Sequence, residues 1–174
     1  MLDFWDILII AVVVVVVLLA LPTILSKIKS VNNIKAIGEK VKLLLPNSTV
    51  ELFDRDEIYQ LEIIQETSKI LIKVVFSRED YEFIITNTNK WTINNNPFQW
   101  TRKSKPIFIE NSDSFVEYKK DDLNISKIVL LYPSSKRIIR YLNESDTVVM
   151  KPEDKFKDIT FIKYEDLEKI LKNR

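Results

Sequence analysis

The first hydrophobic feature of the chain is an unbroken run of 19 uncharged residues at positions 7–25. At 1.5 Å per helical residue the run is about 28 Å long, close to a hydrocarbon core of about 30 Å. We therefore predict a transmembrane anchor at residues 1–26. A cleaved signal peptide is the alternative, but the run is long for one, and Asp3 and Asp6 precede it where a signal peptide carries Lys or Arg.

The residues after the apolar run are basic. Lys27, Lys29 and Lys35 follow it, whereas no Lys or Arg precedes it. Basic residues accumulate on the cytoplasmic side of a span. We therefore predict a single-pass protein of the cell membrane with a cytoplasmic C-terminal domain, and we expect these three lysines to lie near the lipid surface.

Residues 27–46 have a helical pattern. Apolar residues recur at steps of three and four and predict a juxtamembrane amphipathic helix that ends at Pro46. They are Ile28, Val31, Ile34, Ile37, Val41, Leu44 and Leu45. Such a helix can lie against anionic headgroups, or its apolar stripe can pack on the core of the following domain while the lysines stay solvated. We favour packing on the core, and the two interpretations can hold for different turns.

The remaining residues, 47–174, alternate short strand-like runs with polar breakers. Runs rich in β-branched and aromatic residues predict strands at 49–53, 58–65, 69–76, 81–86, 127–132, 137–142, 147–150 and 159–163. Short connections favour an antiparallel meander for the first four. Helices are predicted to begin near Asn96 and Tyr164. The fold class is therefore α/β, a sandwich with a mixed, largely antiparallel sheet flanked by helices.

Composition excludes many kinds of chemistry. The chain has no Cys and no His, so it offers no thiol catalysis, no Ser–His–Asp triad, no haem held by His and no ordinary zinc site. Its single glycine, Gly38, rules out glycine-rich nucleotide-binding loops. Residues 26–174 hold all 26 basic residues and 23 of the 25 acidic ones, a formal charge of +3 that is too small to indicate a nucleic-acid partner.

One segment combines aromatic and basic residues in a way that suits single-stranded nucleic acid. Aromatic rings can stack on bases while neighbouring cations neutralise phosphates. The candidate nucleic-acid-binding residues are Trp91, Phe98, Trp100, Arg102, Lys103 and Lys105. Burial of the aromatic residues in the domain core is the alternative, and we favour it.

Three stretches, taken in order, resemble the nuclease-related domain (NERD) family. Residues 38–40 resemble its opening Gly-Glu, and residues 90–100 resemble its Trp, Asn-Pro and Gln segment. Residues 127–135 and 159–171 resemble its late strands and closing helix. The resemblance implies a PD-(D/E)xK nuclease-like fold, and members of the family often carry a transmembrane helix.

The resemblance also implies positions for a metal-dependent nuclease site. The helix acid of the family corresponds to Glu39, the acid of the next site strand to Glu62, and the lysine to Lys73. Glu39 and Glu62 would then hold Mg²⁺ or Mn²⁺. However, the acid expected two residues before the lysine is Leu71. Because that loss removes a central metal ligand, the resemblance implies a vestigial site.

Two classes of function remain open. One is a membrane-tethered, catalytically degenerate nuclease-related domain that binds nucleic acid. The other is a membrane-anchored adaptor, or an accessory subunit of a membrane complex, that binds a protein partner. An active magnesium-dependent nuclease is a further alternative. Ordinary structural roles also explain the candidate residues: Glu39 can pair with Lys35 or Lys42, and Glu62 can be a solvent-facing strand residue with Lys73 beside it.

Overall fold

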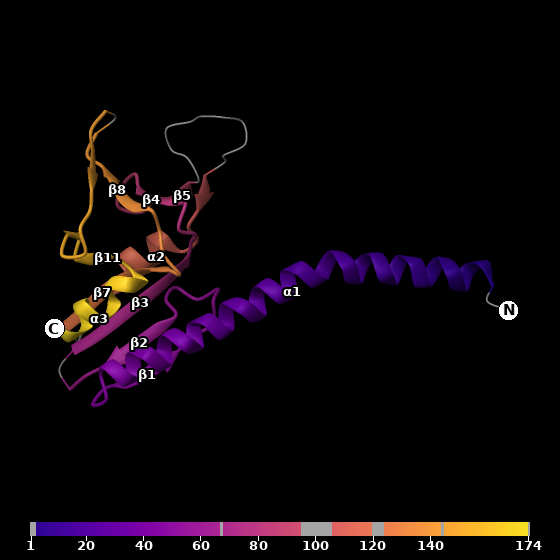
Figure 1. Ribbon diagram of the computed structural model, residues 1–174, viewed down its shortest axis with the longest axis horizontal. Helices are drawn as coiled ribbons and strands as arrows, with labels where there is room; N and C mark the ends of the chain where they lie inside the picture. The colour runs from indigo at the N-terminus through magenta and orange to yellow at the C-terminus, as the bar shows by residue number, and fades with distance from the viewer. Residues whose placement is uncertain (1–2, 67, 95–105, 120–123, 144, 174) are drawn as a thin grey trace.

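A long N-terminal helix projects from a mixed α/β domain (Figure 1). The computed structural model describes residues 3–66, 68–94, 106–119, 124–143 and 145–173. Helix α1 (Phe4–Leu44) runs without interruption from the apolar segment into the domain, and Pro22 lies inside it. The predicted span and the predicted amphipathic helix are therefore two halves of one helix, which is long and apolar enough to cross a membrane.

Six strands form the first sheet, sheet A, in the order β1-β2-β3-β7-β11-β10. They are β1 (Thr49–Leu52), β2 (Leu61–Ile64), β3 (Ser68–Phe76), β7 (Asn124–Tyr132), β10 (Lys155–Phe156) and β11 (Ile159–Lys163). Strands β1, β2 and β3 are antiparallel, whereas β3, β7 and β11 are parallel. The long strands β3 and β7 therefore form the centre of a mixed sheet.

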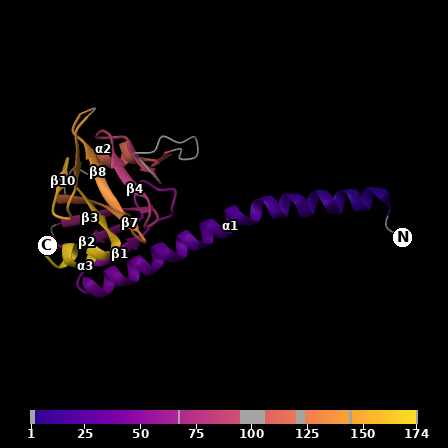
Figure 2. The same cartoon turned by 45° about the horizontal axis from the view of Figure 1, so that its top comes forward.

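Five strands form the second sheet, sheet B, in the order β6-β5-β4-β8-β9. They are β4 (Glu82–Ile85), β5 (Trp91–Asn94), β6 (Ile107–Phe108), β8 (Arg137–Tyr141) and β9 (Thr147–Val149). The remaining elements are α2 (Ser112–Glu117), the 3-10 turn η1 (Tyr164–Asp166) and α3 (Leu167–Lys172). Figure 2 shows the two sheets on the same side of α1.

The C-terminal half of α1 packs on one face of sheet A. Ile34, Ile37 and Val41 are buried there against β2, β3 and β7, and α3 covers the same face. The predicted packing of the amphipathic helix on the domain core is therefore confirmed for these turns, while Ile28 stays exposed. Gly38 lets α1 approach β1, because a Cβ at this position would lie 2.6 Å from Leu52 Cδ2.

The other face of sheet A packs on sheet B. Its strands contribute alternate residues, such as Leu71 and Val129, to a second core with Phe83 of β4 and Phe115 of α2. Because both faces of β3 are buried, this strand is apolar almost throughout. The domain thus has three layers: helices, sheet A and sheet B.

The structure corrects several sequence-based expectations. The antiparallel meander is confirmed for the first three strands, but residues 82–85 belong to sheet B and pair with β8 and β5. A single sheet was expected, and two are found. Strand β5 and helix α2 were not predicted, because each has few apolar residues and depends on tertiary packing. The helix predicted near residue 96 lies outside the described residues.

Candidate functional site

The most distinctive polar group of the domain lies between the two sheets. Charged side chains of β2, β3 and β7 lie on the face of sheet A that packs on sheet B, since they alternate with the residues that face α1. We call this group the inter-sheet polar belt: Glu62, Lys69, Lys73 and Lys127. Glu62, Lys69 and Lys73 are buried and Lys127 is partly buried. Their charges must therefore be compensated within the protein.

Glu62 is compensated by two partners. Its Oε1 forms an ion pair with Lys69 Nζ, and its Oε2 accepts a hydrogen bond of 2.7 Å from the Tyr59 hydroxyl. The Tyr59 ring packs edge to face on Tyr118, with 5.4 Å between the ring centroids. Burial raises the pKa of Tyr59, and contacts with Tyr118 and Glu62 add to the effect. The phenol therefore stays protonated and keeps its hydrogen for Glu62.

Lys73 lies beside a small cavity. Its Nζ donates a hydrogen bond of 3.0 Å to the backbone oxygen of Ile58 and lies 6.0 Å from the centroid of the Phe115 ring. Burial lowers its pKa to about 8, partly offset by the carboxylate of Glu110. The cavity of about 220 Å³ is also lined by Arg55, Asp56, Gln60 and Glu110. Its lining therefore carries both signs of charge.

Lys127 also lies beside the ring of Phe115. Its Nζ donates a hydrogen bond of 2.6 Å to the backbone oxygen of Val116 and lies 5.8 Å from the Phe115 centroid. Burial lowers its pKa, and the positive charge of Lys119 adds to the effect. Two lysines therefore flank Phe115 and fix α2 against sheet A, which is a structural use of buried cations.

The residues that the nuclease resemblance selects are only partly brought together. Glu62 and Leu71 are register partners on β2 and β3, and Lys73 lies two residues further on the same face. Glu39 instead lies on α1, which packs on the opposite face of sheet A, and its carboxylate is exposed and accepts a 3.1 Å hydrogen bond from Lys42. Within the described residues no three acidic side chains are grouped to hold a metal ion.

Two ordinary explanations can now be compared with the structure. The expected pairing of Glu39 with Lys42 is confirmed. The expected exposure of Glu62 is wrong, because its side chain is 7% exposed, and its ionic partner is Lys69. Lys69 was not predicted as a site residue, although Lys69 and Lys73 stand four residues apart in an apolar strand. Because an even number of positions separates them, both lie on the same face of β3, which could have indicated that Glu62 has a buried lysine partner.

Trp91, the first aromatic residue of the candidate nucleic-acid-binding segment, does not lie on the surface. Trp91 is only 1% exposed, its Nε1 donates a 3.0 Å hydrogen bond to the backbone oxygen of Thr88, and its ring contacts Phe115 and Phe161. It is therefore a core residue and offers no face to a base. The other members lie outside the described residues: Phe98, Trp100, Arg102, Lys103 and Lys105.

The three predicted membrane-surface lysines are exposed on α1. Lys27, Lys29 and Lys35 are all exposed to solvent. Lys27 Nζ lies 3.5 Å from a carboxylate oxygen of Asp56, in the loop between β1 and β2. Such an exposed pair stabilises the fold little. It does show that this loop lies beside the end of the apolar half of α1.

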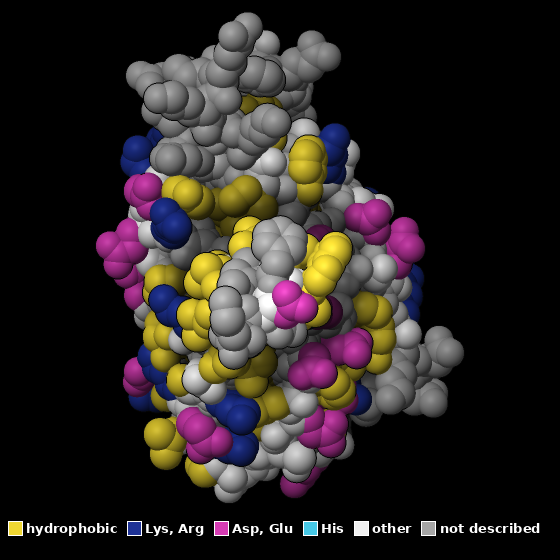
Figure 3. Space-filling model, turned by 90° about the vertical axis from the view of Figure 1, so that its right-hand side faces the viewer, with side chains coloured by type: hydrophobic (Ala, Val, Ile, Leu, Met, Phe, Trp, Pro, Cys, Tyr) yellow, Lys and Arg dark blue, Asp and Glu magenta, His cyan; other side chains and the backbone are white. Residues whose placement is uncertain are grey.

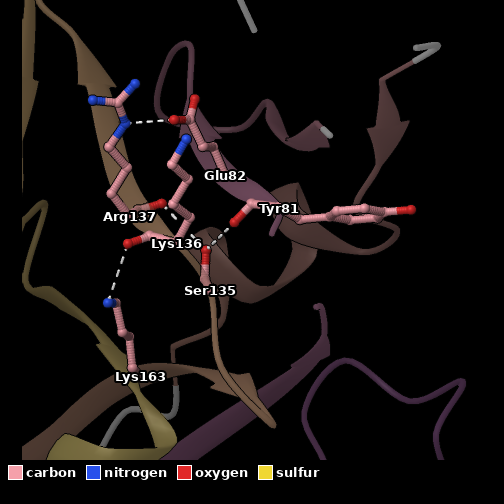
Figure 4. A network of polar contacts seen from close by, with 6 residues as sticks. All are labelled: Tyr81, Glu82, Ser135, Lys136, Arg137 and Lys163. Atoms are coloured by element: carbon pink, nitrogen blue, oxygen red, sulfur yellow. Dashed lines mark hydrogen bonds and ion pairs between the residues drawn. The ribbon is translucent and has the colours of Figure 1, made fainter. Parts of the chain in front are cut away.

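Two polar contacts link the start of β4 to the start of β8. Arg137 Nε donates to Glu82 Oε1 at 2.5 Å, and Ser135 Oγ donates to the backbone oxygen of Tyr81 at 2.8 Å (Figure 4). Beyond this network, the hairpin of β8 and β9 extends from the domain. Its exposed apolar side chains are Leu142, Val148 and Val149. This hairpin is a surface available to a partner.

Comparisons with known proteins give no relatives: no protein-family model, no curated protein and no solved structure matches the chain.

The ion pair between Glu62 and Lys69 yields a stability prediction. Glu62→Gln leaves the Lys69 charge buried without its counterion, which we expect to lower the free energy of unfolding by about 3–5 kcal/mol. Adding Lys69→Met removes both charges and should restore most of that loss. Denaturant unfolding of the full chain in detergent micelles measures both. The exposed pair provides the control, since Glu39→Gln should cost less than about 1 kcal/mol. Equal losses in the single and double variants would contradict this account.

The lowered pKa of Lys73 yields a prediction about pH. Its folded-state pKa of about 8 lies below the unfolded value of about 10.4, so between these values the unfolded chain holds a proton that the native chain has lost. Stability should therefore rise with pH across this window, by an amount on the order of 3 kcal/mol. Lys73→Met should flatten the rise relative to the wild type, whereas Lys35→Met should not. Identical pH profiles for Lys73→Met and the wild type would contradict the prediction.

Proposed function

We propose that this protein is a single-span membrane protein whose domain is a non-catalytic adaptor held on the cytoplasmic surface. The observation that carries the proposal is the continuity of α1. Its first half is apolar and exposed, and its second half supplies Ile34, Ile37 and Val41 to the core of the domain. The domain is therefore attached to the span without a linker.

The start of the domain supports a position directly at the membrane surface. Among the residues of α1 whose burial is described, Ser30 is the first buried one, and it comes only five residues after the apolar run ends at Leu25. Five helical residues advance the chain by about 7.5 Å, roughly the depth of a headgroup layer. The exposed residues Lys27 and Lys29 lie within this interval. Their charge, and the absence of Lys and Arg before the span, support a cytoplasmic domain.

The inter-sheet polar belt supports a binding role in preference to catalysis. Glu62 is neutralised by Lys69, the neighbouring position on β3 is the buried Leu71, and Glu39 lies beyond the opposite face of the sheet. We propose that the domain is a degenerate relative of the nuclease-related family. The adjacency of Glu62, Leu71 and Lys73 on two paired strands supports that descent, and the place of Glu39 departs from it.

The hairpin of β8 and β9 supports a protein partner. In the register of this hairpin, Met150 donates to Ile138 and Leu142 donates to Asp146, so the backbone groups of Thr147 and Val149 point away from β8. An edge strand with free backbone groups and apolar side chains can accept a strand from a partner. We propose that the partner binds here by strand addition.

The absence of Cys allows a clean test of membrane topology. Asp3→Cys and Lys119→Cys place single thiols on the two sides of the proposed span. In intact cells, we expect a membrane-impermeant maleimide to label Asp3→Cys, and to label Lys119→Cys only after the membrane is opened. Labelling of Lys119→Cys in intact cells would contradict the orientation. Loss of the Asp3→Cys thiol from the mature chain would indicate a cleaved signal peptide.

The adaptor proposal makes a separate prediction. A photo-crosslinking residue at Val148 should capture one discrete protein in native membranes, whereas the same residue at Glu51, on the exposed edge of sheet A, should not. Val149→Pro should abolish the capture, because it removes an outward backbone donor. In parallel, the full chain in nanodiscs should neither cleave nor retain DNA or RNA with Mg²⁺ or Mn²⁺. Cleavage that Glu62→Ala abolishes would overturn the proposal in favour of a nuclease.

A further inference from the structure

Strand β6 exposes two large apolar side chains at the edge of sheet B. Ile107 is 55% exposed and Phe108 is 57% exposed. Lys90 lies beside them, with its Nζ 5.4 Å from the centroid of the Phe108 ring. An aromatic ring next to a long cationic side chain is the combination that favours a membrane–water interface, because the ring enters the headgroup layer while the ammonium stays hydrated.

A chain of contacts places β6 close to the end of the apolar half of α1. Lys27, two residues after the apolar run, pairs with Asp56, and Asn111 Nδ2 donates a 3.1 Å hydrogen bond to the backbone oxygen of Asp56. Ile107 and Phe108, a few residues before Asn111, line the same cavity as Asp56. Strand β6 therefore lies on the side of the domain from which α1 leaves toward its apolar half (Figure 1).

The charges on this side are mixed. Arg55 and Lys90 lie near β6, but so do Glu110 and Asp56. The loop between β1 and β2 that carries Asp56 also contains the acids Asp54 and Glu57. Figure 3 views this side along α1 and shows apolar side chains among scattered cations and acids. Attraction to a membrane here must therefore come from the apolar side chains and not from net charge.

We propose that β6 is a second membrane contact, in which Ile107 and Phe108 enter the interface of the leaflet from which α1 emerges. The proposal rests on the membrane anchoring of α1 proposed above. One span alone does not fix the tilt of α1 and its attached domain relative to the bilayer. A second contact beside the span limits that tilt and leaves the hairpin of β8 and β9 available to a partner.

Spin labels on the full chain test this contact, since every introduced Cys is the only one present. Labels at Ile107→Cys, Val149→Cys and Val15→Cys are compared in phosphatidylcholine nanodiscs. For each label we measure how much its spin relaxation is enhanced by oxygen, which dissolves in lipid, and by a nickel complex, which stays in water. We expect the ratio of oxygen to nickel relaxation to be several-fold higher at Ile107 than at Val149, and highest at Val15. Adding Phe108→Asp should lower the ratio at Ile107 to the Val149 level, whereas Val148→Asp should leave it unchanged.

The three positions separate the two proposals. A high ratio of oxygen to nickel relaxation at Val15, with a ratio at Ile107 as low as at Val149, would overturn the β6 contact and leave the anchor intact. A ratio at Val15 as low as at Val149 would overturn the anchor, and the β6 contact with it. A high ratio at Ile107 that Phe108→Asp does not change would show that β6 is shielded by something other than insertion of Phe108, and would also overturn the proposal.

Discussion

The packing of Ile34, Ile37 and Val41 against sheet A is the interaction on which the rest of the structure depends. These residues belong to the same helix as the apolar run, so the element that would cross the bilayer is also one layer of the folded domain. The close approach of α1 to β1 at Gly38 completes this contact. Burial of a helix face on a sheet holds the helix far more firmly than its intrinsic propensity does. The orientation of the domain is therefore set by packing and not by a tether.

The second layer contact, between sheets A and B, has a different character. It contains the buried residues Glu62, Lys69 and Lys73 and the partly buried Lys127, and each charge has a specific partner. Glu62 pairs with Lys69, while Lys73 and Lys127 flank Phe115 and donate to backbone oxygens. Buried charges stabilise a fold little, but they require defined partners and thereby favour one arrangement of the layers. Of these four residues, the nuclease resemblance implies a metal ligand only at Glu62. Here the resemblance and the chemistry diverge, since the acids are separated or neutralised within the described residues.

Much of the fold was predictable where the pattern was local. The apolar run, the helical stripe of residues 27–46 and the antiparallel β1, β2 and β3 all follow from spacing and short connections. The pairing of strands that are distant in the sequence was not predictable from local pattern. For that reason residues 81–86 were assigned to the wrong sheet. Burial of Trp91 in the core, the interpretation favoured over nucleic-acid binding, is confirmed, and its ring contacts Phe115 and Phe161. The sequence indicated Glu62 and Lys73 as positions of the candidate site, but it did not indicate Lys69, the residue that neutralises Glu62.

The central claim is that the apolar half of α1 and the domain form one rigid unit. The distance between spin labels at Val15→Cys and Val149→Cys, measured by pulsed dipolar spectroscopy on the full chain in nanodiscs, tests this claim most directly. A pair at Leu43→Cys and Val149→Cys, within the domain, provides the reference width. The account predicts a single distance distribution for the first pair that is nearly as narrow as the reference. A broad or multimodal distribution beside a narrow reference would show a hinge in α1 and contradict the account.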